Sequence, residues 1–430
     1  MAPCESTKTY SMILRELEPM LRTKLGKDFE LVNYNSDSLL PVGENYGSTI
    51  LKVRAIIKRK GNRNENEETS ELDLVAKMLP ATDFQRVMFD IGTTFRKETF
   101  LYEKLMPAYR QLEEEFGIAE NELFDIVPEF YGSRSSIAQP DGELDEDACI
   151  LMKNLKSEGY YMADRRTGLD LAHAKVAAAA LSRFHALGIA LKIHKLDYFE
   201  IVRKRAKCFT VGSLPEGFTI FVDNFHATIR KDPKTSVYYD QCIAAMSLDM
   251  KELWSEIPVE PWATIIHADF WINNFMFKKD PTTGQVVDIK FVDFQNYLFL
   301  SPLRELTFFL MMNFNSEVME NHFDEVLDYY YDNFINVLRR MKCNVQPFNR
   351  RDFDEAIKKD AFKEFGHCVF ISTVMTKNVL EDTDVAEIQD LLCQDDLDPL
   401  CVQKLRRIIL KYGEKDWFCQ SNTSKSNNST

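Results

Sequence analysis

The chain has 430 residues, of which 45% are hydrophobic and 28% are charged. This composition is typical of a globular protein with room for two domains, and it argues against global disorder. A net charge of −14 argues against a nucleic-acid-binding protein and against binding to anionic membranes. Nine cysteines without a CxxC pair favour reduced thiols, and no secretory segment is visible, so a cytoplasmic location is expected.

The first part of the chain predicts one helix followed by strands. Residues 10–26 show apolar side chains at helical spacing and end at Gly26. Segments 49–57 and 72–78 carry β-branched and aliphatic residues in partial alternation, which is typical of strands. The polar segment 58–71 between them is interpreted as a hairpin loop with solvated charges.

A second helix and two short strands are predicted next. Residues 94–116 have helical apolar spacing, and short strands are expected near 126–131 and 148–152. The acidic segment 139–147 between these strands reads QPDGELDED and is interpreted as a solvated turn.

The remainder of the chain is predicted to be mainly helical. The clearest helix spans 169–191, which is rich in alanine and has leucines at core spacing. A β-like segment, 264–293, interrupts the helical part. Later helices are expected at 216–230, 236–256, 301–313, 317–341 and 352–378.

This order of predicted strands and helices along the chain predicts an α+β fold with two lobes. The strand-rich N-lobe comprises residues 1–152, and the helical C-lobe comprises residues 153–420. Residues 421–430 have low complexity and are expected to form a disordered tail.

The segment 264–293 carries the most specific motif of the chain. His267, Asp269 and Asn274 form the pattern HxDxxxxN, and a strand–turn–strand then leads to Asp293 in the triplet DFQ. A hairpin of this kind brings Asp269, Asn274 and Asp293 to one end. Protein kinases use the same arrangement, HRDxxxxN followed by DFG.

Phosphoryl transfer explains why these residue types occur together. The reaction needs positioning and charge compensation around the phosphates more than covalent help. An Asp beside the acceptor hydroxyl orients it and takes its proton, while an Asn and a second Asp supply hard oxygen ligands to Mg²⁺. We therefore expect Asp269, Asn274 and Asp293 to be catalytic, with His267 orienting the loop backbone.

The motifs HADFWINN, FVDFQ and ALSRFHALG resemble the ecdysteroid kinase-like family, also called CHK kinase-like. This family is related to aminoglycoside phosphotransferases and choline kinases. The resemblance extends over roughly residues 40–310. It implies a protein-kinase-like bilobal fold, ATP and Mg²⁺ as cofactors, and a hydroxylated small-molecule acceptor such as an ecdysteroid. Under this resemblance Asp269 is the base, and Asn274 and Asp293 are the Mg²⁺ ligands.

The resemblance also assigns ATP-binding residues to the N-lobe. Lys77 in LVAKMLP corresponds to the lysine that contacts the α- and β-phosphates. Glu98 is its expected ion-pair partner, with Glu103 as the alternative. Gly47 and Ser48, together with Gly43, resemble the hairpin loop that covers the phosphates.

The stretch 151–155 resembles the hinge between the lobes, where backbone groups of Leu151, Met152 and Lys153 would pair with adenine. Four positions depart from the family pattern. Lys153 and Asn154 replace an acidic pair, Ala268 replaces a glycine, and Glu305 stands where an Asp is expected.

The acceptor pocket is predicted to be an apolar cleft with a few polar anchors. Trp271 and Phe270, which follow Asp269 directly, are the candidates for its lining; several other aromatic residues, Trp254 among them, are also available. The alternative for all of them is core packing. The acceptor is expected to be a steroid or similar xenobiotic. Two other functions remain open, a silent ligand-binding protein on a kinase fold and a choline- or aminoglycoside-type phosphotransferase.

Overall fold

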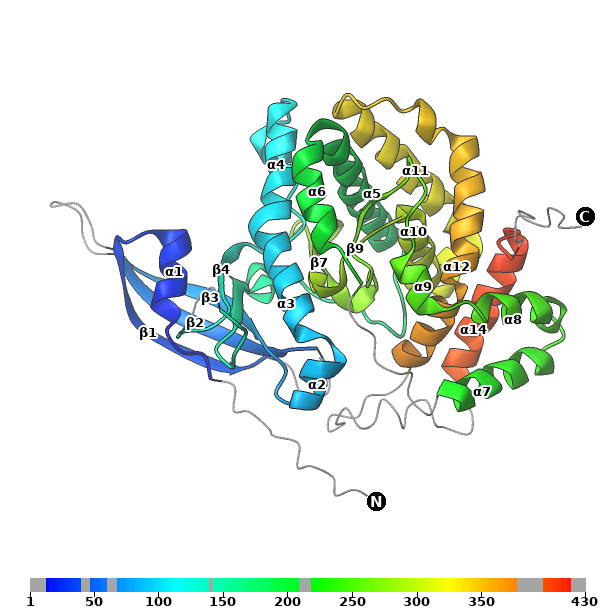
Figure 1. Cartoon of the computed structure of the whole chain (residues 1–430), viewed down its shortest axis with the longest axis horizontal. Helices are drawn as coiled ribbons and strands as arrows, with labels where there is room; N and C mark the ends of the chain where they lie inside the picture. Colours follow the sequence, from blue (N-terminus) through cyan, green and yellow to red (C-terminus); the bar gives the residue numbers. More distant parts are fainter. Residues whose placement is uncertain are drawn as a thin grey trace, which may run out of the picture.

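The computed structural model of the chain describes residues 13–39, 47–59, 68–138, 142–208, 218–376 and 397–418. A sheet with one covering helix forms one end of the molecule, and a larger helical part forms the other (Figure 1). Gly43 of the predicted phosphate loop and the predicted tail 421–430 lie outside the described residues. The α+β architecture expected from the sequence is confirmed.

The N-terminal sheet has five antiparallel strands in the order β1-β2-β3-β5-β4. Their bounds are β1 Phe29–Ser38, β2 Thr49–Arg59, β3 Glu68–Met78, β4 Phe130–Arg134 and β5 Cys149–Lys153. The strands predicted at 49–57, 72–78 and 148–152 are confirmed as β2, β3 and β5. The strand expected at 126–131 begins later, because the carbonyl of Ile126 accepts the N–H of Phe291 from the C-terminal part instead of joining this sheet.

The two faces of this sheet have different partners. Side chains such as Val53, Leu74 and Leu151 pack with Leu21 of the helix α1, Leu17–Leu25, in a cluster of their own. Met152 and its neighbours on the other face join the main core of the molecule. This alternation along the strand follows from the two-residue period of side chains in a sheet.

A long helix stands between the sheet and the helical part (Figure 1). The helix predicted over 94–116 is confirmed as α3, Ile91–Phe100, and α4, Met106–Glu115, which follow one another without a break; α2, Asp83–Met88, was not predicted. A π-helical turn joins α3 to α4, and within it the N–H of Met106 bonds the carbonyl of Leu101. The turn directly precedes Pro107, which has no N–H for an ordinary helical bond.

The helical part contains nine α-helices among the described residues. They are α5 Leu171–His194, α6 Leu196–Arg205, α7 Phe218–Lys231, α8 Tyr239–Met246, α9 Met250–Ser255, α10 Pro302–Met312, α11 Phe323–Arg340, α12 Arg350–Thr376 and α14 Pro399–Glu414. The helix expected over 236–256 is split into a short 3₁₀ turn, α8 and α9, because Asp249 caps a new helix by accepting the N–H of Lys251. The helices α6 and α14 were not predicted.

The β-segment within the helical part forms two small pairs of strands. Strand β7, Phe275–Lys279, pairs with β8, Val286–Phe291, as the predicted hairpin. Strand β6, Thr264–Ile266, pairs with β9, Leu298–Leu300, which was not predicted. The β6–β7 and β8–β9 connections therefore emerge side by side, and these connections carry the motif residues.

Helix α5 forms the centre of the C-terminal core. It packs against α11, β6 and β8, and most of its side chains are buried. By length and hydropathy alone α5 would suffice to cross a membrane. Its burial inside the protein is that of the core helix of a globular domain.

Candidate active site

The connection between β6 and β7 holds Asp269 and Asn274 in a fixed arrangement. A short 3₁₀ turn, Ile272–Asn274, folds the loop back on itself. The Asn274 side-chain amide donates to the Asp269 carbonyl at 2.8 Å and to Asp269 Oδ2 at 2.9 Å. Because both donations use Nδ2, the Oδ1 atom of Asn274 keeps its lone pairs for another partner.

Asp293 follows β8 and lies beside this loop. Its backbone is left-handed, with φ of 64°, so the chain turns sharply after the strand. The preceding residue, Val292, donates its N–H to the Asn274 carbonyl at 3.0 Å. One backbone hydrogen bond therefore joins the two connections and brings Asp269, Asn274 and Asp293 together, as the spacing of the motif predicts.

Lys77 links this end of the C-terminal part to the N-terminal sheet. Its Nζ lies 2.6 Å from Glu98 Oε2 and 2.6 Å from Asp293 Oδ1. Lys77 is on β3 and Glu98 is on α3, and both are buried. The alternative partner, Glu103, is exposed and accepts from the Ser133 hydroxyl at 2.6 Å instead.

Burial and neighbouring charges shift the pKa values of Asp269 and Lys77. Loss of water contact and the negative charge of Asp293 raise the pKa of Asp269 to about 6. Burial opposes the charge on Lys77, but the carboxylates of Asp293 and Glu98 outweigh it and hold the pKa of Lys77 above its ordinary value. The site therefore contains a lysine that stays charged, Lys77, and a carboxylate that takes up a proton at mildly acidic pH, Asp269.

The backbone of the catalytic loop is anchored by Glu305 of α10. Its carboxylate accepts the N–H of His267 at 3.0 Å and the N–H of Ala268 at 2.6 Å. His185 of α5 donates to the same carboxylate at 2.7 Å. Glu305, at the position where the family pattern has an Asp, therefore holds the backbone of this loop at His267 and Ala268. Ala268 has a φ of 66°, the left-handed region that favours the glycine expected at this position.

His267 bridges the two connections. Its Nε2 lies 2.9 Å from the Val292 carbonyl and donates to it, and its ring packs on Phe294. This geometry is that of a residue orienting the loop, in keeping with the structural role proposed from the sequence.

The predicted phosphate loop reaches the site at Gly47. A Cβ at Gly47 would lie 2.9 Å from Nε2 of Gln295, two residues after Asp293, so Gly47 lies against the Gln295 side chain. Ser48 follows at the start of β2 and is buried. Gly47 and Ser48 therefore lie close to the Asp293 end of the site.

The residues predicted as the hinge occupy strand β5. The Leu151 side chain packs in the sheet core on the α1 face and does not face the rest of the site, whereas Met152 faces the main core. The N–H groups of Lys153 and Asn154 donate to the carbonyls of Glu129 and Asp73. These two N–H groups are therefore not available to adenine.

Phe270 is not a pocket residue, contrary to the sequence prediction. Its ring is fully buried and lies 4.5 Å from the ring of Phe275 and 4.6 Å from that of Phe291. The aromatic residue after Asp269 points into the core because the loop reverses there. Trp271 is partly buried and packs against the main core, and it does not line the pocket described next.

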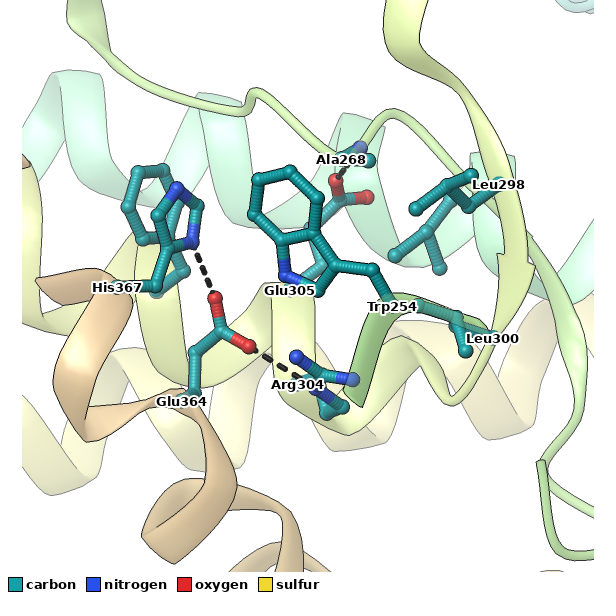
Figure 2. Close-up of a pocket in the computed structure, with 10 residues that line it drawn as sticks. Trp254, Ala268, Leu298, Leu300, Arg304, Glu305, Glu364 and His367 are labelled. Carbon is teal, nitrogen blue, oxygen red and sulfur yellow. Dashed lines mark hydrogen bonds and ion pairs between the residues drawn. The ribbon is translucent and has the colours of Figure 1, made fainter. Parts of the chain in front are cut away.

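A pocket opens on the other side of the catalytic loop (Figure 2). Most of its lining is apolar, and Ala268, the neighbour of Asp269, forms one edge. Three polar side chains from α10 and α12, Arg304, Glu364 and His367, form another. The full lining is Trp254, Ile266, Ala268, Leu298, Leu300, Arg304, Glu305, Phe308, Glu364 and His367.

Among the pocket residues on α10 and α12, Glu305 was named from the sequence, whereas Arg304, Phe308, Glu364 and His367 were not. A usable signal existed in the three-residue spacing of Glu364 and His367, which places both on one face of the helix predicted at 352–378. Trp254 was named only as one of many aromatic candidates, and tertiary packing places it in the pocket.

The oxygen donors of Asn274 and Asp293 fit a magnesium ion that is bound largely by phosphate and water. Asn274 Oδ1 and the carboxylate of Asp293 are hard oxygen donors, and Mg²⁺ commonly takes one or two such protein ligands in nucleotide sites. No group of three or more histidine, cysteine or acidic side chains within the described ranges is placed to hold a metal ion. The residues therefore suit Mg²⁺ brought by a nucleotide better than a metal held by protein ligands alone.

A protein-family model, described as the ecdysteroid kinase-like family, matches residues 42–343, more than half of the chain. A search of curated proteins gives no match. The matched range contains Lys77, Glu98, Asp269, Asn274 and Asp293. It ends before α12, so Glu364 and His367 of the pocket lie outside it.

Proposed function

Because the chain belongs to the ecdysteroid kinase-like family, a family of kinase-like phosphotransferases, we propose that it transfers the γ-phosphate of ATP to a hydroxyl group. The acceptor is an apolar small molecule, an ecdysteroid or a similar steroid or xenobiotic. The observation that carries the proposal is the contact of Lys77 Nζ with both Glu98 and Asp293 at 2.6 Å. This double contact connects the nucleotide-binding part to the catalytic loop.

Each residue has a role that follows from its position. Lys77 binds the α- and β-phosphates, and Glu98 keeps the ammonium group in place. Asn274 and Asp293 would hold Mg²⁺, which supplies charge neutralisation at the phosphates when it is bound. Gly47 permits the phosphate loop to approach Gln295.

Asp269 acts on the acceptor. The hydroxyl oxygen forms a bond to the γ-phosphorus, the bond from phosphorus to the β,γ-bridging oxygen breaks, and ADP leaves. The hydroxyl proton passes to the Asp269 carboxylate. Asn274 fixes that carboxylate by donating to Oδ2 at 2.9 Å.

The pocket beside Ala268 supports an apolar acceptor. Its aliphatic and aromatic lining suits contact with an apolar molecule, and its charged side chains Arg304, Glu364 and His367 are already paired with one another. An aminoglycoside or choline would need carboxylates free to meet a cation, and Glu364 and Glu305 are both engaged. The pocket therefore favours an uncharged alcohol.

The test is a transfer assay with purified protein, ATP and Mg²⁺. The panel contains ecdysteroids, plant steroids, phenolics, choline and an aminoglycoside, and mass spectrometry detects a phosphate adduct. We expect an adduct on an apolar alcohol that disappears in Asp269→Asn. A protein that neither binds ATP nor modifies any acceptor would instead be a silent ligand-binding protein.

A further inference from the structure

We propose that His367 recognises a second hydroxyl group of the acceptor, so that the enzyme selects apolar molecules with at least two hydroxyls. This inference rests on the proposed function, because it places one hydroxyl of the acceptor at Asp269. The residue lies on α12, outside the range matched by the family model.

The position of His367 places it in the pocket close to the reaction centre. It lines the same pocket as Ala268, the residue before Asp269 (Figure 2). An acceptor that occupies this pocket beside Asp269 therefore lies against His367.

The imidazole ring is held in one orientation by aromatic neighbours. Phe308 stacks on it with ring centroids 4.3 Å apart and planes at 7°. Trp254 meets it edge-on, with centroids 5.3 Å apart and planes at 78°. This packing fixes both ring nitrogens in space, as a recognition group requires.

A chain of charged contacts fixes the proton on the ring. Nδ1 of His367 lies 2.5 Å from Glu364 Oε1, and Glu364 Oε2 accepts from Nε of Arg304 at 3.0 Å (Figure 2). Burial alone would raise the pKa of Glu364, but Arg304 and His367 outweigh it and lower that pKa. The carboxylate can only accept, so in the neutral imidazole Nδ1 carries the proton and Nε2 offers a lone pair.

Nε2 of His367 makes no hydrogen bond to the residues that the structure describes, whereas Nδ1 lies 2.5 Å from Glu364 Oε1. An acceptor hydroxyl can supply that partner by donating to Nε2. The reacting hydroxyl cannot do so, because its single proton goes to Asp269. His367 must therefore meet a different hydroxyl of the same molecule.

The test compares two steroid probes, ecdysone with several hydroxyls and pregnenolone with one. In His367→Phe the ring and its stacking on Phe308 are kept while both ring nitrogens are removed; in His367→Gln an amide restores a hydrogen-bonding group. We expect His367→Phe to raise the KM for ecdysone by about 10- to 100-fold, as for a lost hydroxyl contact. The KM for pregnenolone should rise much less than that for ecdysone, and His367→Gln should recover part of the loss with ecdysone.

The control is His322→Phe, since His322 pairs with Glu317 and Glu325 away from the pocket. An equal loss with both steroids, or an unchanged KM for ecdysone, would overturn the role of His367 while leaving the kinase activity intact. Transfer to neither steroid by the wild-type protein would refute the proposed acceptor class, and this inference with it.

Discussion

Lys77 is the residue at which the two parts of the site meet, and Glu98 is the partner that keeps it there. We expect Glu98→Gln to raise the KM for ATP by about tenfold, because a buried lysine loses one of two charged partners and moves toward Asp293. Steady-state kinetics with varied ATP measure the change. Glu103→Gln is the matched control, since Glu103 is exposed and bonds Ser133. Equal effects of the two substitutions would contradict the assignment.

The raised pKa of Asp269 predicts how phosphate transfer depends on pH. Its pKa is raised to about 6, and the base is active as the carboxylate, so activity is lost as the pH falls through that value. A cation held at Asp293 removes part of the charge that raises this pKa, so the acidic limb lies at or below about pH 6. The measurement is kcat/KM for the acceptor from about pH 5 to about pH 8. A rate that increases on acidification would contradict the assignment of Asp269 as the base.

Substitution of Glu305 tests whether the backbone of the loop between β6 and β7 must be held by a carboxylate. In Glu305→Gln one oxygen can still accept, but the amide nitrogen would face an N–H group, so one charged hydrogen bond is lost. We expect a loss of about 1–3 kcal/mol in the free energy of unfolding and a lower kcat. Chemical denaturation and initial rates measure both. Glu317→Gln, at an exposed site, should change neither.

At the scale of elements, the contact between α5 and β6 positions the catalytic loop. A Cβ at Gly188 would lie 2.2 Å from Oγ1 of Thr264 and 2.8 Å from the hydroxyl of Tyr109. We expect Gly188→Ala to destabilise the protein by about 1–3 kcal/mol, as overpacking does in other cores. Thermal unfolding measures the change.

Gly92 provides the matched control for that substitution. It lies exposed in α3, and a Cβ there would meet no atom within 4 Å. Gly92→Ala should be neutral or stabilise by about 0.5–1 kcal/mol, since alanine loses less backbone entropy in a helix. Equal destabilisation by both substitutions would mean that the α5–β6 contact is not specifically tight.

Local sequence patterns predicted the elements whose signals are local. The strands β2 and β3 and the hairpin β7–β8 follow from alternation and turn residues, and α5 follows from its apolar spacing. Local patterns did not predict the structure where a single capping residue, or a hydrogen-bond partner far away in the sequence, determines it. Asp249 starts a new helix within a periodic segment, and the Ile126 carbonyl is taken by Phe291.

The candidate site shows the same difference between features that local patterns predict and features that long-range contacts determine. Asp269, Asn274 and Asp293 could be proposed together because a short hairpin brings them to one end, and the family resemblance assigned Lys77 and Glu98. The pocket could not be predicted in this way: Glu364 and His367 share one helix face, but only the fold places α10 and α12 beside the motif. Phe270 was misassigned because sequence proximity to Asp269 does not show which way the loop turns.

At the scale of the whole molecule, the sheet and the helical part meet in one reaction site. Lys77 lies on β3 of the sheet and Glu98 on α3, whereas Asp293 belongs to the embedded hairpin of the helical part. All the residues that line the pocket beside Ala268 belong to the helical part. Under the proposed function, nucleotide and acceptor reach the loop between β6 and β7 from different elements.

The most direct test follows the γ-phosphate itself. ATP labelled in that phosphate is incubated with Mg²⁺, an apolar alcohol and either wild-type protein or Asp269→Asn. We expect one labelled phosphate on the alcohol for each ADP formed, and a rate lower by about 100-fold or more in Asp269→Asn, which should still bind ATP. Label released only as inorganic phosphate, or a variant as fast as the wild type, would contradict transfer to a hydroxyl by this site.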